Sequence, residues 1–363
     1  MWTAADHAHM AHALRLAELG LYTTTPNPRV GCVIVNRGRV VGTGWHQLAG
    51  QPHAEILALQ QAGQQARNAT AYVSLEPCSH FGRTPPCADA LIAAGVTRVI
   101  AAMQDPNPQV AGSGLARLAA AGITTSCGLL QAQAQQLNPG FIQRMTQQRP
   151  WLRIKTASSL DGKIALPNGD SQWITSAAAR LDVHRLRARS CAILTGIGTI
   201  LADNPQLDVR GLDTSRQPLK IVVDSQLRTP DYAQILQNGR TIIAYTHADT
   251  AKQQKLTQAG AELIQIPARN SHVDLSALMT LLAQRGINEV MTEAGANLNA
   301  ALINAGLVDE WVMYLAPTLL GDAARGLFAL PAPATMSERR QLSISDWRLV
   351  GTDLRITAHF KPD

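Results

Sequence analysis

The stretch His53-Ala54-Glu55, together with Pro77-Cys78 and Cys87, sets the interpretation of the whole chain. It places one imidazole, one carboxylate and two thiols between residues 53 and 87. One histidine and two cysteines can hold zinc with three protein ligands, leaving a fourth position open for water. We therefore predict that His53, Cys78 and Cys87 bind Zn²⁺. Glu55 need not bind the metal, and we expect it to move protons beside it as the catalytic residue.

Apolar residues around this group recur in patterns that alternate between helix and strand. His53 falls in the first turn of a predicted helix, Cys78 follows a predicted strand, and Cys87 begins another helix. Helix N-termini favour thiolate over thiol, the form that a zinc ligand must take. The alternation is typical of an α/β fold with helices layered on a mainly parallel or mixed sheet. We expect helices at 3–20, 53–61, 87–94 and 114–121, strands at 30–35, 40–45, 71–75, 96–103 and 123–127, and partial helix over 131–148.

The chain has 363 residues, more than a single core usually holds, so two domains are expected. A segment rich in glutamine and alanine ends at Arg149-Pro150, and we divide the chain there into domains 1–147 and 148–363. A second α/β alternation follows this boundary. It predicts strands at 151–158, 191–195, 219–224, 241–246, 262–266, 289–292, 310–316 and 347–360, and helices at 177–189, 275–285 and 297–305.

Composition narrows the class of protein. Hydrophobic residues make up 46% and charged residues 16%, which is an ordinary globular composition. No apolar run approaches the roughly 20 residues of a membrane span, and no secretory signal opens the chain, so we expect a cytoplasmic protein without membrane contact. Five widely spaced cysteines favour metal or catalytic use over disulfides. The net charge of +6 comes from scattered basic residues, which suits anionic small molecules as well as nucleic acid.

The spacing of the two cysteines leaves several kinds of site open. The signature H-x-E with P-C-x-x-C is typical of zinc deaminases that act on nucleobases. Here eight residues separate Cys78 from Cys87, and this weakens a match to the nucleic-acid deaminases. A structural zinc with His80 as fourth ligand, or buried cysteines without metal, are the alternatives.

Two glycine turns in the second half follow apolar strands and precede probable helices. One runs from Cys191 through Gly196-Ile197-Gly198, and the other from Glu289 through Gly295. Exposed backbone amides at such turns can bind anions. Neither turn has the G-x-G-x-x-G pattern, so the sequence does not predict a Rossmann dinucleotide site.

These motifs together resemble a known family, the bifunctional riboflavin-biosynthesis proteins, in which a pyrimidine deaminase is fused to a pyrimidine reductase. The resemblance covers nearly the whole chain, and the long spacing of the cysteines is the family's own form. The matching runs in the first half are Asn27–Val35, Gly42–His46, His53–Glu55, Tyr72–His80, Gly82–Cys87 and Asp105–Pro108. Those in the second half are Lys155–Lys163, Ser171–Thr175, Leu194–Thr199, Asp203–Leu207 with Arg210, and Glu293–Gly295.

The resemblance implies a cytidine-deaminase-like three-layer domain followed by a dihydrofolate-reductase-like domain. It implies a substrate too, a diaminopyrimidinone that carries a ribosylamino 5′-phosphate. The first site would replace a ring amine by oxygen, and the second would reduce the ribose to a ribityl chain with NADPH. We expect a homo-oligomer whose partner is this small molecule rather than nucleic acid.

The resemblance also assigns roles to single residues. His53, Cys78 and Cys87 match the zinc ligands, and Glu55 matches the proton shuttle. The residues that match NADPH contacts are Ala157, Trp173, Thr199, Asp203, Ser225, Gly295, Ala296 and Asn297. Those that match reductase substrate contacts are Ser171, Arg187, Leu207, Arg210 and Glu293. Asn27, His46 and Arg83 are the candidate contacts of the deaminase substrate. Forked guanidinium donors such as those of Arg187 and Arg210 suit a phosphate group.

Two rival interpretations make different predictions. A deaminase acting on a nucleic-acid base needs a basic groove and aromatic side chains for stacking, yet aromatic residues are only 4% of this chain. A non-enzymatic protein stabilised by zinc would keep its function after Glu55→Gln. An enzyme that deaminates a free pyrimidine ribotide would lose its activity in that variant.

Overall fold

The computed structural model describes residues 2–79, 85–108 and 110–360 of the chain. Within it the chain forms two compact units, residues 1–148 and residues 149–363. Each unit has its own sheet and its own hydrophobic cores. No helix in the described chain has both the length and the apolarity needed to cross a membrane.

The first unit is built on a mixed sheet with the strand order β2-β1-β3-β4-β5. β1 runs antiparallel to β2 and β3, whereas β3, β4 and β5 are parallel to one another. Residues 31–35 of β1 are all buried, as expected for a strand covered on both faces. The strands are β1 (Gly31–Asn36), β2 (Arg39–Trp45), β3 (Thr70–Val73), β4 (Arg98–Ala101) and β5 (Thr124–Cys127).

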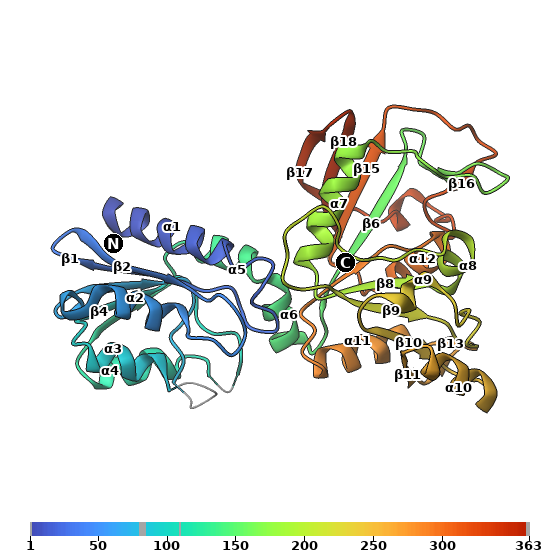
Figure 1. Ribbon diagram of the computed structural model, residues 1–363. Helices are drawn as coiled ribbons and strands as arrows, with labels where there is room; N and C mark the ends of the chain where they lie inside the picture. The colour runs from blue at the N-terminus through green and yellow to red at the C-terminus, as the bar shows by residue number, and fades with distance from the viewer. Residues whose placement is uncertain (1, 80–84, 109, 361–363) are drawn as a thin grey trace. The chain divides into compact units, whose positions relative to one another are not determined.

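Helices cover both faces of this sheet, which gives three layers (Figure 1). α1, α5 and α6 enclose one core with Val33 and Tyr72, while α2, α3 and α4 enclose the other with Cys32 and Val73. A capping box between Thr3 and Asp6 begins α1. The helices are α1 (Ala4–Glu18), α2 (Ala54–Ala62), α3 (Cys87–Ala93), α4 (Ser113–Ala120), α5 (Gln131–Leu137) and α6 (Pro139–Gln147), with a 3-10 turn at Gly63–Ala66.

The second unit has a larger sheet, nine-stranded in the described residues, with the order β11-β10-β9-β8-β14-β6-β15-β18-β17. The strands from β11 to β15 are parallel, and the last two form an antiparallel hairpin beside β15. The strands of this sheet are β6 (Trp151–Ser159), β8 (Ala192–Gly196), β9 (Leu219–Val223), β10 (Thr241–Tyr245), β11 (Ala261–Gln265), β14 (Glu289–Thr292), β15 (Glu310–Ala316), β17 (Leu342–Val350) and β18 (Asp353–Phe360). Two small ribbons pair β7 (Lys163–Ala165) with β16 (Arg325–Gly326), and β12 (Ala268–Arg269) with β13 (His272–Val273).

Helices again pack on both faces of this sheet. One core joins α7, α8 and α10 to the sheet, and the other joins α11 and α12 to it. The helices are α7 (Ala177–Arg189), α8 (Ile197–Asp203), α9 (Gln234–Gln237), α10 (Thr250–Gln258), α11 (Leu275–Gln284) and α12 (Ala296–Asn304), with a 3-10 turn at Met336–Glu338.

The sequence-based elements differ from these in a few places. Thr250–Gln258 was not predicted as a helix, because Leu256 is its only buried residue and its apolar pattern is therefore weak. The strand expected over 96–103 is limited to Arg98–Ala101, and the segment 131–148 forms two helices instead of one partial helix. The final hairpin begins at Leu342, five residues before the expected start at residue 347.

Candidate zinc centre and reductase cavity

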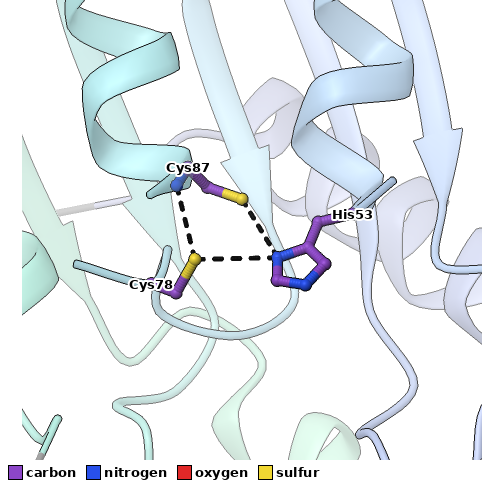
Figure 2. A group of neighbouring side chains, drawn as sticks. All are labelled: His53, Cys78 and Cys87. Carbon is purple, nitrogen blue, oxygen red and sulfur yellow. Dashed lines mark hydrogen bonds between the residues drawn. The ribbon is translucent and has the colours of Figure 1, made fainter. Parts of the chain in front are cut away.

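Three side chains converge in the first unit, from the start of α2, the loop after β3 and the start of α3 (Figure 2). His53 Nδ1 lies 3.2 Å from Cys87 Sγ and 3.6 Å from Cys78 Sγ, and the backbone N–H of Cys87 donates to Cys78 Sγ at 3.3 Å. One ligand atom from each of the three residues lies within 4.8 Å of the others. This donor set and spacing fit a single zinc ion, and three protein ligands leave one of its four tetrahedral positions to another ligand.

The fold fixes His53 and Glu55 through the start of α2. His53 is the N-cap residue of this helix, and Glu55 is buried in its first turn. α2 lies so close to β2 that a Cβ atom on Gly42 would be 2.1 Å from the carbonyl oxygen of Ala58. One on Gly44 would be 2.2 Å from that of Ala54. The two glycines therefore allow the close contact that sets the position of the helix start.

The surroundings of Cys78 and Glu55 shift their pKa values in opposite directions. Hydrogen bonds from Cys87 and His53 lower the pKa of the Cys78 thiol to about 4, although burial opposes this. Burial raises the pKa of Glu55 to about 7, and the charge of Cys78 adds to this effect. The centre thus combines a thiol that readily becomes a thiolate with a buried carboxyl group.

The candidate contacts of the deaminase substrate lie near the same centre. The His46 ring packs edge-on to the His53 ring, with 5.3 Å between centroids. Asn27 Nδ2 lies 3.0 Å from His46 Nε2. Burial lowers the pKa of His46, which favours its neutral form. Arg83, and His80 as an alternative fourth ligand, lie outside the described residues.

The second unit contains a cavity of about 510 Å³ lined in part by residues 155–157 of β6, by α8 and by residues 293–295 after β14. Most residues that the resemblance assigned to NADPH or to the reductase substrate contribute to its wall. The predicted residues that line it are Ala157, Ser171, Trp173, Arg187, Thr199, Asp203, Leu207, Arg210, Glu293 and Gly295.

Three predicted cofactor contacts are absent from the described lining of this cavity: Ser225, Ala296 and Asn297. Ser225 Oγ instead accepts the backbone N–H of Val273. Ala296 and Asn297 open α12 directly after Gly295, which does line the cavity.

The carboxylate of Glu293 pairs with two basic side chains in this cavity. It accepts hydrogen bonds from Arg187 Nε at 2.5 Å and Arg187 Nη2 at 3.0 Å, and Lys155 Nζ lies 3.5 Å away. Burial alone would raise the pKa of Glu293, but the charges of Arg187 and Lys155 lower it to about 2. Sequence reasoning missed Lys155 and His184, which also line the cavity. The sequence could have indicated Lys155, because it precedes Ala157 by two positions and residues two apart on a strand lie on the same face.

Comparisons with family models and with known proteins match both units of the chain. A family model described as the RibD C-terminal domain matches residues 150–356. A second, described as the cytidine and deoxycytidylate deaminase zinc-binding region, matches residues 3–103. The riboflavin biosynthesis protein RibD of Escherichia coli (strain K12) is 50% identical over 362 residues, which cover 96% of this chain and 98% of that protein.

Solved structures agree with this match. Acinetobacter baumannii RibD superposes with a TM-score of 0.93 at 42% identity, over 99% of both chains. A deaminase/reductase from Thermotoga maritima superposes with a TM-score of 0.87 at 29% identity, over 98% of this chain and 99% of that one. That protein is a diaminohydroxyphosphoribosylaminopyrimidine deaminase/5-amino-6-(5-phosphoribosylamino)uracil reductase. The three-layer first domain and the reductase-like second domain expected from the sequence are therefore confirmed.

Proposed function

Because the chain belongs to the family of the bifunctional riboflavin biosynthesis protein RibD, we propose that it catalyses two successive steps on one phosphorylated pyrimidine. The first unit deaminates 2,5-diamino-6-ribosylamino-4(3H)-pyrimidinone 5′-phosphate. The second reduces the ribosyl group of the product to a ribityl chain with NADPH. The observation that carries the first step is the convergence of His53, Cys78 and Cys87 beside the buried Glu55.

In the deaminase site, His53, Cys78 and Cys87 would hold a zinc ion. Zinc, when bound, supplies the Lewis acidity that activates water for attack on the ring carbon. Glu55 takes a proton from that water and passes it to the ring amine, which leaves as ammonia while oxygen takes its place. Asn27 and His46 orient the pyrimidine beside these groups.

In the reductase site, we assign different roles to Arg187, to Arg210 and to the remaining substrate contacts. Arg187 donates three of its N–H groups within the protein, two to Glu293 and one to the carbonyl of Asp208, so its main role is to hold that carboxylate in place. Arg210 has a side chain that is 58% exposed at the cavity, and we assign it to the substrate phosphate. Ser171, Leu207 and Glu293 complete the proposed substrate contacts.

The cofactor side of the cavity fits NADPH, which when bound supplies the hydride. Trp173 presents an exposed ring there, with the guanidinium carbon of Arg180 4.6 Å from a ring centroid. Among the described residues, no side chain caps the N-terminus of α12 at Gly295, so its amides can meet an anionic group. Ala157, Thr199 and Asp203 line the same cavity. By resemblance alone, Ser225, Ala296 and Asn297 are further proposed contacts.

The two steps can be tested separately on one preparation. Removing zinc with a chelator should abolish deamination of the free ribotide and leave NADPH oxidation with the already deaminated substrate intact. The expected separation follows because the metal ligands lie in the first unit and the NADPH cavity in the second. The measurement is both half-reactions, with zinc content, before and after chelation and after adding zinc back.

Two results would contradict this proposal. Deamination that survives full loss of zinc would remove the metal from the reaction. Deamination of a cytosine- or adenine-containing oligonucleotide, with none of the free ribotide, would favour the nucleic-acid deaminase instead.

None of the five cysteines forms a disulfide in the described structure, which supports the cytoplasmic location that we also propose.

We further propose that two copies associate through the apolar face of the final hairpin. A bulge after Ile344 keeps Ile344, Trp347 and Leu349 of β17 opposite Ala358, Ile356 and Leu354 of β18, on one face of the sheet. Trp311, Met313 and Leu315 of β15 continue this face, where Trp311 already packs against Phe328, and no charged residue occupies any of these positions. Trp347 is 71% exposed. An uncharged apolar face of this kind suits a two-fold contact with itself better than a charged partner.

Trp347→Glu should shift the protein towards the monomer, because each two-fold contact would bury two carboxylates. Sedimentation velocity across a range of protein concentrations measures the shift. Tyr232→Glu is the matched control, since Tyr232 is similarly exposed in the same unit but lies between β9 and α9, and β9 is well separated from the hairpin in the strand order. A wild-type protein that is monomeric at all concentrations, or a variant that associates like wild type, would exclude this surface.

A further inference from the structure

Glu76 is a buried carboxylate just before the Cys78 segment, and it holds four backbone N–H groups. Its Oε2 accepts from Asp105 at 3.0 Å and from Gly112 at 2.9 Å. Its Oε1 accepts from Gly114 at 2.8 Å and from Leu115 at 3.1 Å. Gly114 and Leu115 belong to the first turn of α4, where a negative charge is also favoured by the helix dipole. The carboxylate therefore ties the chain before Cys78 to the start of this helix.

The same helix start lies in direct contact with the residue between Glu76 and Cys78. A Cβ atom on Gly114 would be 1.9 Å from the carbonyl oxygen of Pro77, a distance at which one backbone would have to move. On the other side of Cys78, the hydroxyl groups of Ser79 and Ser113 are 2.7 Å apart. α4 thus contacts the chain both before and after the cysteine.

Arg117, one turn further along α4, joins this segment to the second cysteine. Its Nε and Nη2 pair with the two carboxylate oxygens of Asp89 at 2.6 and 2.9 Å. Its Nη1 donates to the carbonyl oxygen of Ser79 at 3.4 Å. Asp89 lies in the first turn of α3, the helix that begins with Cys87. One side chain therefore links the segments that carry both thiols.

We propose that α4, acting through Glu76 and Arg117, positions Cys78 and Cys87 at the spacing that zinc requires. The inference rests on the proposed zinc site. Glu76 and Arg117 do not contact the ligand atoms of that site, so both would act by positioning the two cysteines. Hydrogen bonds to an ionised carboxylate are about twice as strong as neutral ones, so four of them hold the loop firmly. Outer partners that orient metal ligands typically account for about 10- to 100-fold in metal affinity.

Glu76→Gln is a sharp test because it keeps the size of the side chain. The amide has one oxygen acceptor and an NH₂ group, which would face two of the four N–H donors instead of accepting from them. The affinity of the variant for zinc, measured against a competing chelator, should therefore fall by about 10- to 100-fold, and zinc should leave it faster than it leaves the wild type. Arg117→Met should act in the same direction, and Arg117→Lys should recover part of the effect by restoring the charge opposite Asp89.

Arg98→Met is the matched control, since it breaks another arginine–aspartate pair of the same unit, with Asp6, and its zinc release should be unchanged. The unfolding of the zinc-free proteins, measured in parallel, separates positioning from stability. A positioning role predicts faster zinc release even when the zinc-free variant unfolds like wild type. Arg117 is about half exposed, so its variant tests the inference even where Glu76→Gln fails to fold.

Zinc release at the wild-type rate from both Glu76→Gln and Arg117→Met would overturn this role of α4. Faster release that matches the loss of stability of the zinc-free form would overturn it too. A wild-type protein that binds no stoichiometric zinc, or a Cys78→Ser variant that retains it, would instead overturn the zinc site itself. The two failures are therefore distinguishable.

Discussion

Glu55→Gln is expected to lower the rate of deamination by about 10²- to 10⁴-fold, the usual contribution of a positioned proton-transfer group. The amide matches the carboxylate in shape but can no longer take a proton from water and deliver it to the leaving amine. Glu55 is buried in the first turn of α2, and its neighbour His53 supplies the proposed metal ligand, so the geometry of the ligands should persist. Zinc content should stay at the wild-type level.

The measurement is single-turnover deamination of the free ribotide, with zinc determined on the same sample. Glu18→Gln is a control on an exposed glutamate of the same unit and should behave like wild type. NADPH oxidation with the deaminated substrate should also be retained by Glu55→Gln. Undiminished deamination would remove Glu55 from proton transfer, and loss of zinc would show that its role is structural.

How much of this site was predictable depends on how its residues are spaced along the chain. His53, Glu55, Cys78 and Cys87 were predictable because their residue types suit a catalytic zinc site. His53 and Glu55 lie at the start of α2 and Cys87 begins α3, while Cys78 lies in the loop after β3. Glu76 was not singled out, because its four partners lie 29 to 39 positions away and only the folded loop brings them together. A lone glutamate before a proline carries no such signal.

The cavity of the second unit shows the same limit. Arg187 and Arg210 were both expected to suit a phosphate, since both are arginines near matching motifs. In the structure, Glu293, which follows β14 and lies more than 100 residues away in sequence, accepts hydrogen bonds from Arg187, whereas the more exposed Arg210 contacts Gln206 and Asp208. Sequence patterns identify residue types and local elements, but the pairing of distant charges is decided by tertiary structure.

The second large effect is expected for Arg153→Met, which should destabilise the second unit by about 3–5 kcal/mol. Arg153 is 0% exposed, and its Nη2 lies 2.7 Å from Glu310 Oε2 and 3.6 Å from Glu289 Oε2. Burial alone would raise the pKa of Glu310, but the charge of Arg153 lowers it to about 2. Methionine would leave this carboxylate buried without its main counter-charge. Urea unfolding, followed by NADPH oxidation as the signal of the second unit, measures the loss.

A double variant separates the charge from the packing. Arg153→Met with Glu310→Gln removes both charges and keeps an acceptor for Trp151, whose Nε1 donates to Glu310 at 3.0 Å. It should recover most of the lost stability, because an apolar replacement of a buried pair is often neutral. A single variant as stable as wild type would show that Glu310 is neutral in the folded protein.

The Arg153–Glu310 pair is also connected to the reductase cavity, through strand β6. Arg153 lies directly opposite Glu310 in the register between β6 and β15, and Lys155 and Ala157 follow on the same strand face, where they line the cavity. The buried pair thus fixes the alignment of the strand that presents these two side chains. At a temperature where Arg153→Met is still folded, we therefore expect a raised KM for NADPH or substrate, whereas deamination in the first unit should remain at the wild-type rate.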